Sequence, residues 1–78
     1  SRAFDAAYET EAGLASDTER LLDHYDLLLT HGTLRTETRS RIAGIIEALE
    51  GESEEILQLR ARVASILVMT SPEYLVLR

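Results

Sequence analysis

The stretch that decides the fold is SEEILQLRARVASILVMT, residues 53–70. Its apolar side chains recur at helical spacing and form two adjoining stripes. Together the stripes cover well over half of the circumference, which is typical of a helix surrounded by other elements. We therefore predict a central helix with the first, bulkier stripe as its main core face. The first stripe comprises Ile56, Leu59, Val63, Ile66 and Leu67, and the second comprises Leu57, Ala61, Ala64 and Val68.

Polar residues mark where this helix and the preceding one begin. Ser53 is placed to cap residues 53–70, because its hydroxyl can accept a hydrogen bond from an amide of the first turn. In SDTERLLDHYDLLLTHG, residues 16–32, Ser16 and Glu19 have the spacing of a capping box. Gly32 supplies the left-handed stop that ends a helix.

A third helical pattern lies between these two, in TLRTETRSRIAGIIEALEG, residues 33–51. Its apolar residues form one narrow stripe, which predicts a one-sided surface helix. Thr36 can cap its start, and Gly51 ends it. Gly44 lies inside the helix, where its bare backbone favours the close approach of another element.

The two ends of the chain carry weaker patterns. Residues 1–15 place a few apolar side chains among acids, which predicts a weak N-terminal helix. The last ten residues, MTSPEYLVLR, residues 69–78, contain a helix start, because Ser71 is a good cap and Pro72 suits the first helical position. Tyr74 can bury its ring while its hydroxyl finds a partner, as a structural lock does.

The patterns together predict an all-α fold with residues 1–78 as a single helical module. The fold is a small antiparallel three-helix bundle with a weak N-terminal helix and a short C-terminal helical turn. The loops around Gly32 and Gly51 are short enough to make neighbouring helices antiparallel. We expect the core to contain Leu21, Leu22, Tyr25, Leu28, Leu29, Ile42, Ile45, Ile46, Leu49, Leu59, Val63, Ile66 and Leu67.

The composition excludes several classes of function. The chain of 78 residues is 45% hydrophobic, contains no cysteine and carries a net charge of -6. A negative chain lacks the positive surface that nucleic acids require. No stretch approaches the ~20 apolar residues of a membrane-spanning helix, so we expect no membrane insertion.

No motif for catalysis, metal binding or a cofactor stands out. His24 and His31 are seven positions apart, whereas zinc ligands on one helix normally lie three or four apart. Asp23 and Asp26 could carry out acid–base chemistry only if their environments separated their pKa values, and a solvated helix face does not do so. We therefore expect no catalytic, cofactor-binding or metal site within this chain.

The segments DLLLTHGTL, TRSRI and RVASILVMTSPEYLVLR, ending with the SPEY motif and Arg78, resemble the C-terminal end of a bacterial family. This is the domain-of-unknown-function-eighteen-hundred family, whose members are large, mostly helical and often exported. The resemblance covers roughly residues 20–78. It implies that the chain is the C-terminal fragment of a larger protein with an exported or periplasmic location.

The leading hypothesis for function is a non-enzymatic helical module that stabilises its parent protein or binds a protein partner. It rests on apolar surface in excess of one small core, which also favours a symmetric homodimer. The alternative is a subdomain lining the active site of an enzyme whose catalytic residues lie upstream, with Asp23, His24, Asp26 and Tyr74 as contributors. The candidate partner contacts are Leu27, Leu57, Val68, Tyr74, Leu75 and Leu77.

Overall fold

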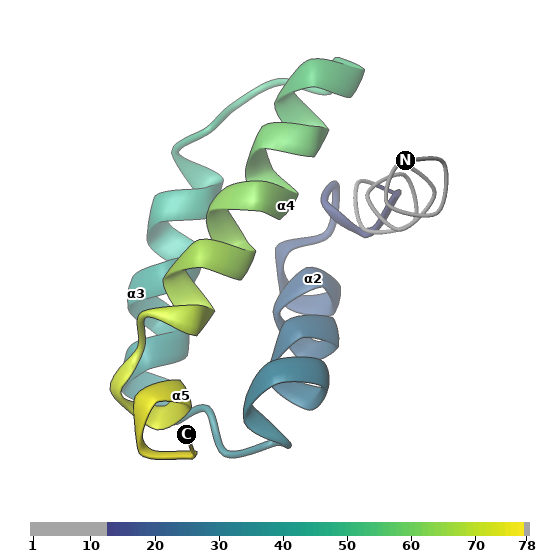
Figure 1. Ribbon diagram of the computed structural model, residues 1–78. Coiled ribbons are helices and arrows are strands. Elements are labelled where there is room, and N and C mark those ends of the chain that lie inside the picture. Colours follow the sequence, from purple (N-terminus) through teal and green to yellow (C-terminus); the bar gives the residue numbers. More distant parts are fainter. Residues whose placement is uncertain (1–12, 78) are drawn as a thin grey trace.

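The chain folds as an all-α bundle, as predicted. The computed structural model describes residues 13–77, and no strand occurs within that range. Figure 1 shows α2 running down, α3 running up and α4 running down again, with α5 at the lower end of α4. The predicted N-terminal helix falls almost wholly on residues 1–12, which lie outside the described residues. The elements are α2 (Thr18–Tyr25), the π-helix η1 (Asp26–Thr30), α3 (Thr36–Glu47), α4 (Glu54–Met69) and α5 (Pro72–Leu77).

Short polar side chains cap the N-termini of three helices. The predicted cap of α4 is confirmed, since the Ser53 hydroxyl accepts a hydrogen bond from the Ile56 amide at 3.2 Å. Ser71 does the same for α5, where its hydroxyl accepts from the Tyr74 amide at 3.3 Å. The predicted cap of α2 is wrong by one position, because Asp17 and not Ser16 is the cap.

The first helix widens into η1 over its last five residues, which the sequence patterns did not predict. A π-helix closes its hydrogen bonds over five residues, so the residue five positions after Tyr25 lies nearer to the face of Tyr25 than it would in an α-helix. Thr30 is therefore fully buried. Leu28, which an α-helix would have turned inward, is 57% exposed and is not part of the core.

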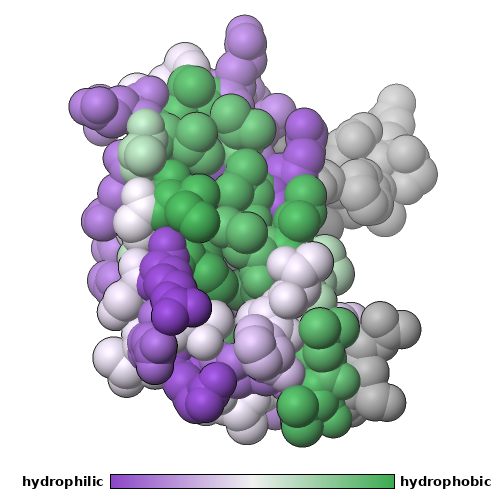
Figure 2. Space-filling view, turned by 90° about the vertical axis from the view of Figure 1, so that its left-hand side faces the viewer, coloured by the Kyte–Doolittle hydropathy of each residue, from purple (hydrophilic) through white to green (hydrophobic). Residues whose placement is uncertain are grey.

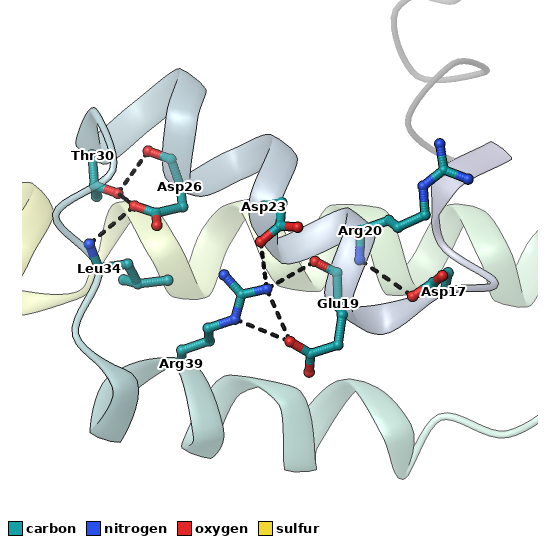
Figure 3. Close-up of polar contacts among 8 residues, drawn as sticks. All are labelled: Asp17, Glu19, Arg20, Asp23, Asp26, Thr30, Leu34 and Arg39. Carbon is teal, nitrogen blue, oxygen red and sulfur yellow. Dashed lines mark hydrogen bonds and ion pairs between the residues drawn. The ribbon is translucent and has the colours of Figure 1, made fainter.

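The Asp26 carboxylate fixes the chain where η1 ends and the loop to α3 begins (Figure 3). It accepts hydrogen bonds from the Thr30 hydroxyl and from the Leu34 amide, the latter at 3.0 Å. His31 has a left-handed φ of 55° and Gly32 one of 80°, so the left-handed stop begins one residue before the predicted glycine.

Arg39 of α3 connects that helix to α2 (Figure 3). Its guanidinium lies 2.7 Å from the Asp23 carboxylate and 2.9 Å from the Glu19 carboxylate, and it also donates to the Glu19 carbonyl. Burial acts to lower the pKa of Arg39, but its bonds to Asp23 and Glu19 raise that pKa above the ordinary value. These contacts fix the position of α3 against α2.

The core lies where α2, α3 and α4 meet. Five predicted core residues are confirmed as buried: Leu21, Leu22, Tyr25, Ile42 and Ile46. Four others are only half-buried: Leu29, Leu49, Val63 and Leu67. Ile45, Leu59 and Ile66 are exposed and were wrongly assigned to the core. The buried apolar side chains are Ala15, Leu21, Leu22, Tyr25, Leu34, Ile42, Ile46, Ala61, Ala64 and Val68.

Candidate interaction surface

The α4 helix is turned with its bulkier stripe outward, opposite to the prediction. Its second stripe faces the core: Ala61, Ala64 and Val68 are fully buried and Leu57 is half-buried. Val68 is therefore not available for the expected partner contact. The assignment of Leu57 stays a prediction, because a half-buried side chain can still contact a partner. Two alanines at the centre of the stripe allow α2 and α3 to pack close to the α4 axis, because the distance between helices depends on the side chains at the contact.

Apolar side chains outside the core occur on α3 and its following loop as well as on α4, and these two helices contact each other. Figure 2 shows a contiguous apolar area on the side of the molecule where α3 and α4 lie. Ile45 is 48% exposed and Ile66 is 49% exposed, which are high values for isoleucine in a folded chain. We define the α3–α4 face by six apolar residues of α3, its following loop and α4 that lie exposed or half-buried: Ile45, Leu49, Ile56, Leu59, Val63 and Ile66.

The residues of α4 within this face have a narrow and regular spacing. Ile56, Leu59, Val63 and Ile66 follow one another at intervals of three, four and three residues. A stripe restricted to these positions is the pattern of a coiled-coil seam, which packs against another helix. This spacing was the one sequence signal that could have identified Leu59 and Ile66 as surface residues.

Two charged residues stand along the solvent side of the stripe. Glu55 and Arg62 are both exposed and carry opposite charges. A shallow depression of about 380 Å³ on α4 lies between them, and the face residues Ile56 and Leu59 help to line it. The face thus combines apolar side chains with a polar edge, as interaction surfaces do.

The other predicted contact residues lie near η1 and α5. Leu27 is 74% exposed and Leu75 is 55% exposed, so both are on the surface as expected. Tyr74 is half-buried in α5, which packs against η1 and α4. The side chain of Leu77 lies outside the described residues.

The polar residues of the enzyme hypothesis take part in structural contacts. Asp23 pairs with Arg39, and Asp26 holds the loop before α3. The His24 ring lies edge-on to the Tyr25 ring, with centroids 5.1 Å apart. Across residues 13–77, no three His, Asp or Glu side chains gather as metal ligands would.

No helix in the described part of the chain is long and apolar enough to cross a membrane. The family resemblance of the SPEY ending stays a prediction. No family model matches the chain, and neither a curated protein nor a solved structure is similar to it.

Proposed function

We propose that the chain is a non-enzymatic helical module for protein–protein interaction. Its α3–α4 face packs against the same face of a second copy. The observation that carries this proposal is the outward orientation of the α4 stripe, which has the spacing of a helix–helix seam. A contiguous apolar surface bordered by charged residues marks interaction sites in soluble proteins.

A second copy fits the size and the charge of the face. A standard interface buries about 800 Å² on each partner, which is about one sixth of the 5115 Å² accessible surface. One helix stripe is too narrow to supply this area, so Ile45 and Leu49 of the α3 side must contribute as well. Although the net charge is -6, Glu55 and Arg62 place both signs beside the stripe, which lessens the repulsion between two copies there.

The mass of the folded chain in solution, measured by light scattering behind a sizing column, tests this proposal. We expect a dimer for the natural sequence and a folded monomer for Ile66→Glu, because a carboxylate would be desolvated in the apolar seam. Leu27→Glu is the matched control, since Leu27 is exposed on η1 and outside the face. A monomeric natural chain at high concentration would contradict the proposal, as would an Ile66→Glu chain that remains dimeric.

A further inference from the structure

We propose that α5 is a pH-sensitive latch, which detaches in acid while α2, α3 and α4 remain folded. Release of the latch leaves an amide at the start of α3 without its acceptor and uncovers the surfaces of η1 and α4 against which α5 packs. The α3–α4 face contains no residue of α5, so this inference does not depend on the proposed self-association. It follows from the contacts that hold α5 in place.

A buried carboxylate attaches α5 to the start of α3. The two segments lie side by side at the lower end of the bundle (Figure 1). One oxygen of Glu73, Oε2, accepts a hydrogen bond from the Arg35 amide at 2.9 Å. The other, Oε1, lies 3.6 Å from the Arg35 guanidinium, and the Glu73 side chain is only 7% exposed. A hydrogen bond to an ionised acceptor is stronger than one between neutral groups, so the attachment depends on the charge of Glu73.

The helix α5 buries little apolar surface of its own. Tyr74 is half-buried, but Leu75 and Val76 are exposed, Val76 by 83%. A hollow of about 360 Å³ lies between α5 and the loop before α3, and Thr33 and Pro72 help to line it. A segment with few buried apolar contacts opens locally at a lower free energy than the core. The charged contact of Glu73 is therefore a large part of what holds α5.

The surroundings of Glu73 suit the ionised form and not the protonated one. Oε1 is buried and has no hydrogen-bond partner. The Arg35 guanidinium beside it has only donors, so a proton bound to Oε1 would place one donor next to another. Protonation also removes the charge that strengthens the bond from the Arg35 amide. Loss of both contributions favours the detached state of α5, in which water solvates the neutral carboxyl.

Other titratable groups on the elements around α5 are engaged elsewhere or exposed. The Asp26 carboxylate of η1 holds an amide of the loop before α3 at 3.0 Å, and Glu37 forms an ion pair within α3. His31 is exposed at the end of η1. Residues 63–69, the last two turns of α4, carry no charged side chain. Glu73 is therefore the carboxylate whose protonation acts directly on α5.

Amide hydrogen exchange across a pH series, followed by NMR and expressed as protection factors, tests the latch. The Leu75 amide reports on α5, because it donates to the Ser71 carbonyl at 3.1 Å, and the Arg35 amide reports on the attachment. We expect both to lose about tenfold in protection together in acid, the factor that corresponds to one charge-assisted hydrogen bond. The amide of Ala61, which is fully buried in α4, should keep its protection. Simultaneous loss at all three amides would overturn the latch, as would protection of Leu75 that does not change with pH.

Two variants identify the carboxylate responsible. In Glu73→Gln the carboxamide has no charge to lose, so we expect the Leu75 amide to be weakly protected already at neutral pH and to stay so in acid. Glu37→Gln is the matched control, since it makes the same change in the first turn of α3 at an exposed position. Its Leu75 amide should respond to acid as in the natural chain. A full acid response that persists in Glu73→Gln would overturn the latch.

Discussion

The carboxylate of Glu73 in α5 accepts a hydrogen bond from the backbone amide of Arg35, 38 positions earlier, at 2.9 Å. Arg35 is the N-cap residue of α3, and its own side chain makes no capping bond. A helix start leaves amides that need an acceptor, and a negative charge there also favours the helix dipole. The C-terminal tail therefore caps a helix distant in the sequence, in addition to packing on η1 and α4.

The cap formed by Glu73 predicts a pH-dependent stability. Burial acts to raise the pKa of this carboxyl, but hydrogen bonds from the Arg35 amide and from Thr38, with the Arg35 charge, lower it below the ordinary 4.5. A carboxyl with a lowered folded-state pKa stabilises the fold above its unfolded pKa, and this is lost as pH falls through the folded value. We expect Glu73→Gln to cost about 1–2 kcal/mol at neutral pH, and the cost to shrink in acid.

Urea unfolding of the natural chain and Glu73→Gln across a pH series measures this difference. Glu52→Gln removes an exposed carboxylate from the α3–α4 loop and is the matched control. A Glu73→Gln cost that stays constant from neutral to strongly acidic pH would contradict the assignment of the cap to the ionised carboxylate.

The Arg39 cluster predicts a second stability difference. Its side chain is 21% exposed, and its guanidinium contacts Glu19 and Asp23 of α2. We expect Arg39→Met to lower the free energy of unfolding by about 1–2 kcal/mol, because two carboxylates lose a charge-assisted partner. Arg41→Met should cost less than about 0.5 kcal/mol, since its pair with Glu37 lies within one exposed helix face. Equal costs in thermal unfolding would show that Arg39 does not join the helices.

The sequence was sufficient for features that depend on a few neighbouring residues. The caps of α4 and α5 follow from Ser53 and Ser71, and both are confirmed. The Glu73 cap could not be predicted, because it joins residues 38 positions apart. The burial of Thr30 followed from the π-helical turn, and no hydrophobic pattern encodes that change of helix type.

The orientation of α4 is opposite to the predicted one, and it determines the candidate surface. Both stripes are apolar, so periodicity alone cannot say which of them faces the core. The face that is buried depends on the space between the three helices. The small side chains of Ala61 and Ala64 fit into this space, whereas a row of isoleucine and leucine does not. Hydrophobicity predicts that the bulkier stripe faces the core, whereas the packing of the three helices buries the stripe with the smaller side chains.

The glycines of α3 and its loop predict opposite responses to alanine. The expectation that another element packs closely against Gly44 is wrong, because a Cβ atom built at this position would have no neighbouring atom within 4 Å. Gly44→Ala should therefore stabilise the chain by about 0.5–1 kcal/mol, as alanine favours a helix interior. Gly51→Ala should destabilise it, because Gly51 has a φ of 122° and its Cβ would meet Ile56 at 3.4 Å. Thermal unfolding measures both, and stabilisation by Gly51→Ala would contradict the left-handed loop.

The orientation of α4 predicts that Val68 and Ile66, two residues apart on one helix, affect different properties. Val68 is fully buried, so Val68→Ala should lower the free energy of unfolding by about 2 kcal/mol through lost burial and a cavity. Ile66→Ala removes more apolar atoms but from an exposed position. Its cost to the folding of each copy should stay below about 1 kcal/mol, while the dimer should weaken measurably.

Urea unfolding at low concentration, where copies are apart, isolates the folding of each chain, and light scattering against concentration measures association. The two variants serve as controls for each other, because both shorten an aliphatic side chain on the same helix. A larger unfolding cost for Ile66→Ala than for Val68→Ala would mean that α4 faces the core with its bulkier stripe. The α3–α4 face would then not be available to a second copy, and the proposed dimer would lose its structural basis.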